Sequence, residues 1–183
     1  MIFRNIAEFA LIIAVWGSFQ FLFTEGYLGS AALPAVIVAS LSKTIFFGIE
    51  NIRQLFEATR SNQAYHRFML LMLVNMTQII LSFGLDFHCL HQINAASFSV
   101  DLTDTSYFDT VFEFVYYSTL NFTFFGYGDV TPQTVTAKFI TMTEILLAFV
   151  TVIFLLSDFI SLKESLGRPK SDSETRDLDA PKS

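Results

Sequence analysis

Four long apolar segments alternate with polar segments along the chain: residues 6–23, 31–49, 68–85 and 139–162. Each has about eighteen residues or more, which is enough for a helix that crosses a bilayer. A fifth apolar and aromatic segment, 108–122, is short for a span. It suits a re-entrant helix, which a membrane tolerates only where protein surrounds it. The pattern predicts an all-α membrane protein of four transmembrane helices, with a re-entrant helix and a loop between the third and the fourth.

Two of these segments leave an alternative open. The first could be a signal peptide, because the small residues 29–32 follow it, but Glu25 interrupts the chain before them. After the second, Ile52, Leu55 and Phe56 recur at helical spacing. This recurrence fits either a helix lying on the membrane surface or an extension of the second span.

Several polar residues lie in or beside the predicted spans. Lys43 is expected to extend its ammonium group to the interface, and Asp86 and His88 mark the end of the third span. Two further residues of the third span, Asn75 and Gln78, are expected to hydrogen-bond between helices. Glu144 lies within the fourth span, where a functional carboxylate and a hydrogen-bonded structural one are equal interpretations. Residues 91–107 show no helix or strand period and are predicted to be a loop.

Composition agrees with a membrane protein. Only 15% of the residues are charged, against about 25% in a typical soluble domain. The net charge of −6 argues against nucleic acid as a partner. Cys89 is the one cysteine, so it is either a buried thiol or a bridge between two subunits.

The positive charges predict an orientation. In a four-span arrangement only Lys138 falls on one side of the membrane. Because Lys and Arg accumulate on the cytoplasmic side, both termini are expected in the cytoplasm and the protein in the plasma membrane. The ten residues on the cytoplasmic side are Arg4, Lys43, Arg53, Arg60, Arg67, Lys163, Arg168, Lys170, Arg176 and Lys182.

The stretch Gly126-Tyr127-Gly128-Asp129 stands between the 108–122 segment and the last span. With Tyr116-Tyr117-Ser118 before it and Thr131-Pro132 after it, the stretch resembles the selectivity filter of the potassium channel family. The resemblance covers roughly residues 68–162 and not the first two spans.

The resemblance implies a potassium-selective ion channel subunit that conducts K⁺ passively as a homotetramer in a lipid membrane. It divides the chain into an N-terminal hairpin (1–50), a cytoplasmic linker or interfacial helix (51–67), a pore domain (68–162) and a disordered cytoplasmic tail (163–183). No cofactor is expected, and no metal beyond permeant K⁺. The implied ion-binding residues of the filter are Thr123, Phe124, Phe125, Gly126, Tyr127, Gly128 and Asp129, with Tyr116 and Tyr117 as filter support.

This sequence departs from the family pattern at several positions, and one of them is Phe125, where the family usually has Val. Phe124 replaces a Thr, so its ring either narrows the inner mouth or packs behind the filter. Leu120 replaces a Glu, which leaves Tyr116 or Tyr117 to hold Asp129, unless that residue faces external water. Ala148 replaces a glycine, so the last helix should be stiff.

One face of the last span is a candidate pore lining. Its residues recur at spacings of three and four, which places them on one side of a helix. They either line the inner pore and close it by dewetting, or pack against other spans. These residues are Phe149, Val152, Leu156 and Ile160.

Three other functions remain possible: a weakly selective cation channel, a non-conducting regulatory subunit and a membrane enzyme. The sequence contains no candidate catalytic residue, metal cluster or phosphate-binding loop, and no span has the series of Arg or Lys that a voltage sensor needs.

Overall fold

The computed structural model describes residues 2–25, 29–60, 65–102, 106–126 and 128–167, some of them by backbone alone. Almost all of this part is helical. The α-helices are α1 (Ile2–Thr24), α2 (Ala32–Arg60), α3 (Tyr65–Ile93), α4 (Tyr107–Phe122) and α5 (Val135–Gly167). Short elements join them: the 3-10 turns η1 (Gly29–Ala31) and η2 (Ala95–Ser97), and the strands β1 (Phe98–Ser99) and β2 (Thr131–Pro132).

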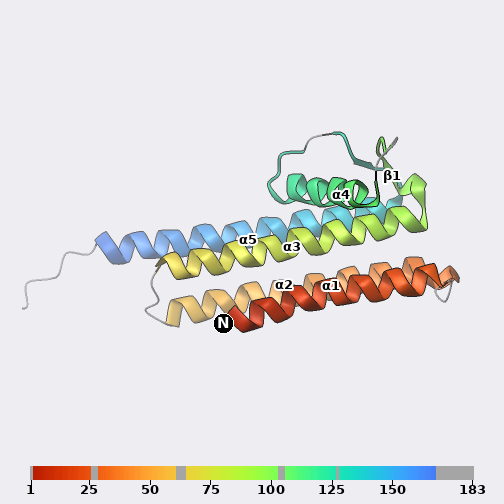
Figure 1. The fold of residues 1–183 in the computed structure, drawn as a ribbon. Coiled ribbons are helices and arrows are strands. Elements are labelled where there is room, and N and C mark those ends of the chain that lie inside the picture. Colours follow the sequence, from red (N-terminus) through yellow and green to blue (C-terminus); the bar gives the residue numbers. More distant parts are fainter. Residues whose placement is uncertain (1, 26–28, 61–64, 103–105, 127, 168–183) are drawn as a thin grey trace, which may run out of the picture.

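The helices form layers (Figure 1). α3 and α5 run side by side in the middle, α1 and α2 pack below them, and the shorter α4 lies on the opposite side near the α3–α4 connection. α2 contacts both α3 and α5, and α4 contacts the same two helices. The α3–α5 pair therefore joins the N-terminal hairpin to α4.

Within the part of the chain that the structure describes, three helices are long and apolar enough to cross a membrane: Ala32–Glu50 in α2, Met69–Ile93 in α3 and Val135–Leu156 in α5. In α1 the apolar stretch found among the described residues, Glu8–Thr24, is shorter. The structure thus confirms three of the four predicted spans by length and composition.

Two helices continue past the boundaries expected from the sequence. α2 is one helix as far as Arg60, so the extension of the second span is the correct alternative, and a separate surface helix is wrong for this part. α5 reaches Gly167, so residues 163–167 are helical rather than disordered. The remainder of the expected tail, 168–183, lies outside the described residues.

The prediction of a loop over residues 91–107 is also wrong in part. α3 continues to Ile93, and β1 pairs antiparallel with β2 in the register Phe98↔Pro132 and Ser99↔Thr131. The Gln133 N–H also donates to the Ser97 carbonyl at 2.8 Å. Each strand has only two residues, which is too short for the alternation of apolar and polar residues that identifies a strand in a sequence. They attach the chain after residue 130 to the α3–α4 connection.

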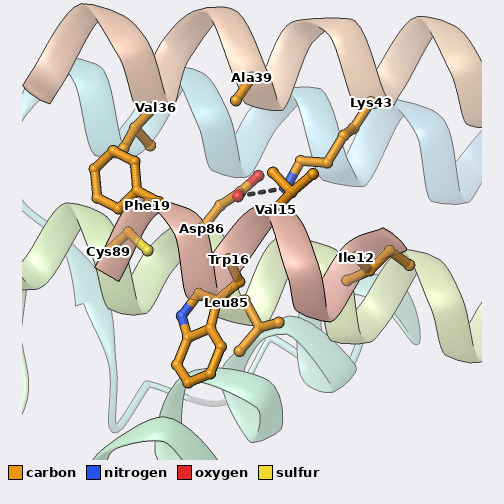
Figure 2. A pocket seen from close by; sticks show the side chains of 10 residues that line it. All are labelled: Ile12, Val15, Trp16, Phe19, Val36, Ala39, Lys43, Leu85, Asp86 and Cys89. Carbon is orange, nitrogen blue, oxygen red and sulfur yellow. Dashed lines mark hydrogen bonds and ion pairs between the residues drawn. The ribbon is translucent and has the colours of Figure 1, made fainter. Parts of the chain in front are cut away.

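Lys43 of α2 and Asp86 of α3 form an ion pair between the two helices. Asp86 is 8% exposed within α3, and its Oδ1 forms an ion pair with Lys43 Nζ of α2. Figure 2 shows the Lys43 side chain extended along the hairpin toward this carboxylate. His88, two residues further along α3, is also buried. The candidate span in α3 continues to Ile93, so the expectation that Asp86 and His88 mark its end is wrong by length and composition. Lys43 has its ion-pair partner in α3, and its reach to the interface stays a prediction.

Other polar contacts join the N-terminal hairpin to α3. Gln78 Nε2 donates to Glu8 Oε2 at 3.2 Å, as expected for an interhelical partner. Gln20 Nε2 lies 3.4 Å from His88 Nδ1 and 3.8 Å from the sulfur of Cys89, a free and buried thiol. A cavity of about 30 Å³, with Lys43, Asp86 and Cys89 among its lining residues, lies at this junction (Figure 2).

Gly84 allows α4 to pack closely on α3. A Cβ at this position would lie 2.7 Å from the Val115 Cα, and a backbone atom cannot move aside as a side chain can. We expect Gly84→Ala to lower the free energy of unfolding in detergent by about 1–3 kcal/mol, because the helices must separate. Gly17→Ala is the control, since its Cβ meets nothing within 4 Å. Equal stability of the two variants would contradict the close packing.

Candidate functional site

The start of α4 is fixed by a capping box. Ser106 Oγ accepts from the Asp109 N–H at 3.3 Å, and Asp109 Oδ2 accepts from the Ser106 N–H at 3.1 Å. Asp109 therefore lies in the first turn, where a negative charge suits the helix dipole. The hydrogen bonds from the Ser106 side chain and backbone lower the pKa of Asp109 below its usual value. The cap is thus formed with an ionised carboxylate at neutral pH.

The buried face of α4 makes polar contacts with α5. The Tyr117 hydroxyl lies 3.2 Å from Thr141 Oγ1. Glu144, with 0% of its surface exposed, accepts from Ser118 Oγ through Oε1 and from Asn121 Nδ2 through Oε2, the latter at 3.1 Å. These contacts all involve the second half of α4, so the helix is anchored on α5 close to its C-terminal end.

The backbone that follows α4 is hydrogen-bonded to the last turn of that helix. The Thr123 N–H donates to the Thr119 carbonyl at 3.0 Å, the Phe124 N–H to the Asn121 carbonyl at 3.1 Å, and the Phe125 N–H to the Leu120 carbonyl at 2.9 Å. These bonds occupy carbonyls that a helix end leaves without partners. The position of residues 123–125 is therefore set by the position of the α4 end.

Two residues of this loop have a left-handed backbone. Gly126 has φ +62° and Phe124 has φ +58°. A glycine adopts such a φ freely, whereas a bulky residue does so at a cost. Gly126 therefore occupies a backbone conformation that favours glycine, whereas the φ of Gly128 is not in this range. Tyr127 lies outside the described residues.

The loop is exposed in the single chain. Phe125 is 74% exposed and Phe124 is 47% exposed, while Gly128 and Asp129 also face outward. The Phe124 ring meets Phe149 of α5 edge-on, with ring centroids 6.5 Å apart. The Phe124 ring thus contacts α5 within the single chain, and the choice between a ring that narrows the inner mouth and one that packs behind the filter stays a prediction.

Comparison with known families identifies the larger part of the chain. The model of a family described as "Ion channel" matches residues 69–164, more than half of the sequence. The chain belongs to this ion channel family. No significant match was found among curated proteins or among solved structures. The matched region begins in α3 and ends in α5, so α4 and the exposed loop lie within the ion channel domain, whereas α1 and α2 precede it.

The ion channel domain exposes apolar side chains on α5. Phe149 is 55% exposed, Leu156 is 56% exposed and Val152 is half-buried. These three and Ile160 are the residues predicted to share one helix face. The side chain of Ile160 lies outside the described residues. The exposure leaves this face available for a pore, for lipid or for another subunit.

One predicted support of the loop is wrong within the chain. The Tyr117 hydroxyl pairs with Thr141 rather than with Asp129, which is exposed. Tyr116 is 39% exposed on the other side of α4. A contact between Tyr116 and Asp129 remains a prediction.

Sequence reasoning missed the partners of Glu144. Ser118 was noted only as part of an aromatic-aromatic-Ser run, and Asn121 was not singled out at all. A signal did exist, because Ser118 and Asn121 are three residues apart and so share a helix face. Only the packing of α4 on α5 shows that this face meets a carboxylate.

Proposed function

We propose that the chain is a subunit of a potassium-selective channel that passes K⁺ down its gradient through a homotetramer. In this proposal α1, α2, α3 and α5 are the transmembrane helices, α4 is a re-entrant pore helix, and residues 123–129 form the selectivity filter. The observation that carries it is the Gly-Tyr-Gly-Asp motif at residues 126–129, within an ion channel domain. It directly follows residues 123–125, whose backbone is hydrogen-bonded to the end of α4.

The backbone of the loop suits ion binding better than its side chains do. Carbonyl oxygens of Phe124, Phe125, Gly126 and Tyr127 would replace the hydration shell of K⁺, with Thr123 at the inner edge. The C-terminal end of α4 adds a partial negative charge beside them, which favours a cation. Because one chain supplies only one row of oxygens, a closed ring needs several chains, and the potassium channel family uses four.

The orientation follows from the charge distribution. With Lys138 alone on the opposite side of the membrane, both termini are cytoplasmic and the filter opens outward in the plasma membrane. The exposed apolar residues of α4 and α5 then face neighbouring subunits, the pore or lipid.

Ion flux from liposomes that contain only the purified protein tests the proposal. We expect K⁺ and Rb⁺ to leave much faster than Na⁺, from a protein whose mass in mild detergent is that of four chains. Equal K⁺ and Na⁺ flux would favour a weakly selective cation channel, for which the Phe at position 124 is a specific argument. Absence of flux from intact tetramers would favour a non-conducting subunit.

Phe124 is expected to limit conductance. Its ring lies against Phe149, one of the proposed pore-lining residues, so four rings would narrow the inner mouth and make it apolar. A Thr would remove the ring and add a hydroxyl oxygen. We expect Phe124→Thr to raise the unitary K⁺ conductance with little change in selectivity. Phe108→Thr, on an exposed residue at the start of α4, is the control. Equal or lower conductance in Phe124→Thr tetramers would contradict this role.

The lower part of α5 is a candidate hydrophobic gate. Leu156 and Ile160 lie one turn apart on the proposed pore face, and four apolar copies of either can close a narrow pore by excluding water. We expect Leu156→Asp and Ile160→Asp to raise resting K⁺ flux, whereas Leu156→Ile, which stays apolar, should not. If neither Asp variant raises flux in assembled protein, these residues form no gate.

A further inference from the structure

Glu144 has no part in the conduction proposed above, yet it is one of the most deeply buried residues of the chain, with 0% of its surface exposed. It lies about one third of the way along α5. An apolar side chain would fill the same space without the cost of burying a polar or charged group. The carboxyl group therefore needs an explanation in terms of its hydrogen bonds.

Both oxygens of Glu144 are bonded to α4. Oε1 accepts from Ser118 Oγ, and Oε2 accepts from Asn121 Nδ2 at 3.1 Å. Ser118 Oγ also lies 2.8 Å from the Ile80 carbonyl of α3. Because a serine hydroxyl has a single proton, Ser118 donates to only one of these two acceptors at a time. The Glu144 carboxyl group of α5 and the Ile80 carbonyl of α3 thus meet at a single turn of α4.

The same turn of α4 holds the loop through backbone hydrogen bonds. The Asn121 side chain is held by Glu144, and the Asn121 carbonyl accepts the Phe124 N–H at 3.1 Å. The neighbouring Leu120 carbonyl accepts the Phe125 N–H. A continuous series of hydrogen bonds therefore runs from the α5 carboxyl group, through Asn121, to the backbone of residue 124.

We propose that Glu144 is a positioning residue that fixes the filter to α5 through Ser118 and Asn121. The inference rests on the function proposed for the loop. A displacement of α5 is then transmitted to the ion-binding backbone by directional bonds, and not by packing alone. Because the loop is otherwise exposed and its Phe124 has an unfavourable φ, loosening the α4 end would let residues 123–126 relax.

Three variants separate this role from packing. Glu144→Met keeps a long side chain but removes both acceptors. Glu144→Gln keeps one oxygen for Ser118, and the Asn121 amide can turn to accept from the new NH₂ group. Thr143→Val is the matched control, because its hydroxyl donates to the Phe139 carbonyl of α5 itself at 2.9 Å.

The readouts are K⁺/Na⁺ selectivity and amide hydrogen exchange at Phe124 and Phe125, both measured on intact tetramers. In Glu144→Met we expect exchange at these amides to be at least about tenfold faster and the K⁺/Na⁺ permeability ratio to fall about tenfold. Glu144→Gln should stay within about threefold of the wild type, and Thr143→Val should match it. A purely structural Glu would lower the yield of tetramers but leave both readouts unchanged in those that form.

Two further outcomes are failure of Glu144→Met to assemble and absence of K⁺ conduction by the wild type. If Glu144→Met does not assemble, Ser118→Ala removes one of the two donors and should accelerate the same exchange to a smaller degree. If the wild type does not conduct K⁺, the proposed function fails, but exchange still decides whether Glu144 holds the loop. Unchanged exchange in Glu144→Met, or in Ser118→Ala where it replaces that variant, would overturn the inference.

Discussion

Gly126→Ala should abolish K⁺ conduction without preventing assembly. The φ of this residue is +62°, and a Cβ built there meets nothing within 4 Å. The substitution therefore causes backbone strain and no clash. A left-handed Ala costs about 1–2 kcal/mol per chain. Over the four chains of the proposed tetramer this is at least about 4 kcal/mol, which lowers the population of the conducting conformation roughly a thousandfold.

Gly128→Ala is the matched control for this experiment. Its Cβ also meets nothing within 4 Å, but its φ is not left-handed. The structure therefore predicts a smaller loss of conduction than at Gly126. The measurement is K⁺ flux per tetramer, after the mass of each variant has been checked. Normal conduction by Gly126→Ala tetramers would refute the filter assignment.

Gly126 and Gly128 belong to the same short motif but differ in φ, and this difference illustrates what the sequence can predict. A Gly-Tyr-Gly-Asp stretch between apolar segments is a local pattern that predicted the loop, and the apolar segment 108–122 predicted the short helix before it. The sign of φ at each glycine depends on the hydrogen bonds between the loop backbone and the carbonyls of Leu120 and Asn121. The spacing of residues in the sequence does not predict these bonds. The helices were likewise predictable because apolar runs are long, whereas β1 and β2, with two residues each, were not.

Polar residues within the spans were the least predictable part. The sequence located Lys43, Asp86 and Glu144, but their roles depend on partners 23 to 43 positions away in the chain. Lys43 was expected at the interface because a long side chain can usually reach water. Its pairing with Asp86 instead requires α2 and α3 to lie side by side. A lone sequence contains no record of that neighbour.

Lys43→Met should strongly destabilise the packing of the N-terminal hairpin on the ion channel domain. The Lys43 side chain is 21% exposed and that of Asp86 is 11% exposed, so water screens the pair poorly. Without the ammonium group, the carboxylate stays buried between helices with its ion-pair partner gone. Breaking such a pair from one side costs about 3–5 kcal/mol. We expect this loss in the free energy of unfolding in detergent, and Asp86→Leu should cause a similar one.

The double variant Lys43→Met/Asp86→Leu distinguishes a charge effect from a loss of packing. Replacing both partners by apolar residues leaves no unpaired charge, so its stability should return to within about 1 kcal/mol of the wild type. Lys138→Met, which removes an exposed cation from α5, is the control and should change stability by less than about 0.5 kcal/mol. If the two single losses simply add in the double variant, the ion pair does not hold the hairpin. The junction then depends on its remaining contacts, among them Gln78–Glu8 and Gln20–His88.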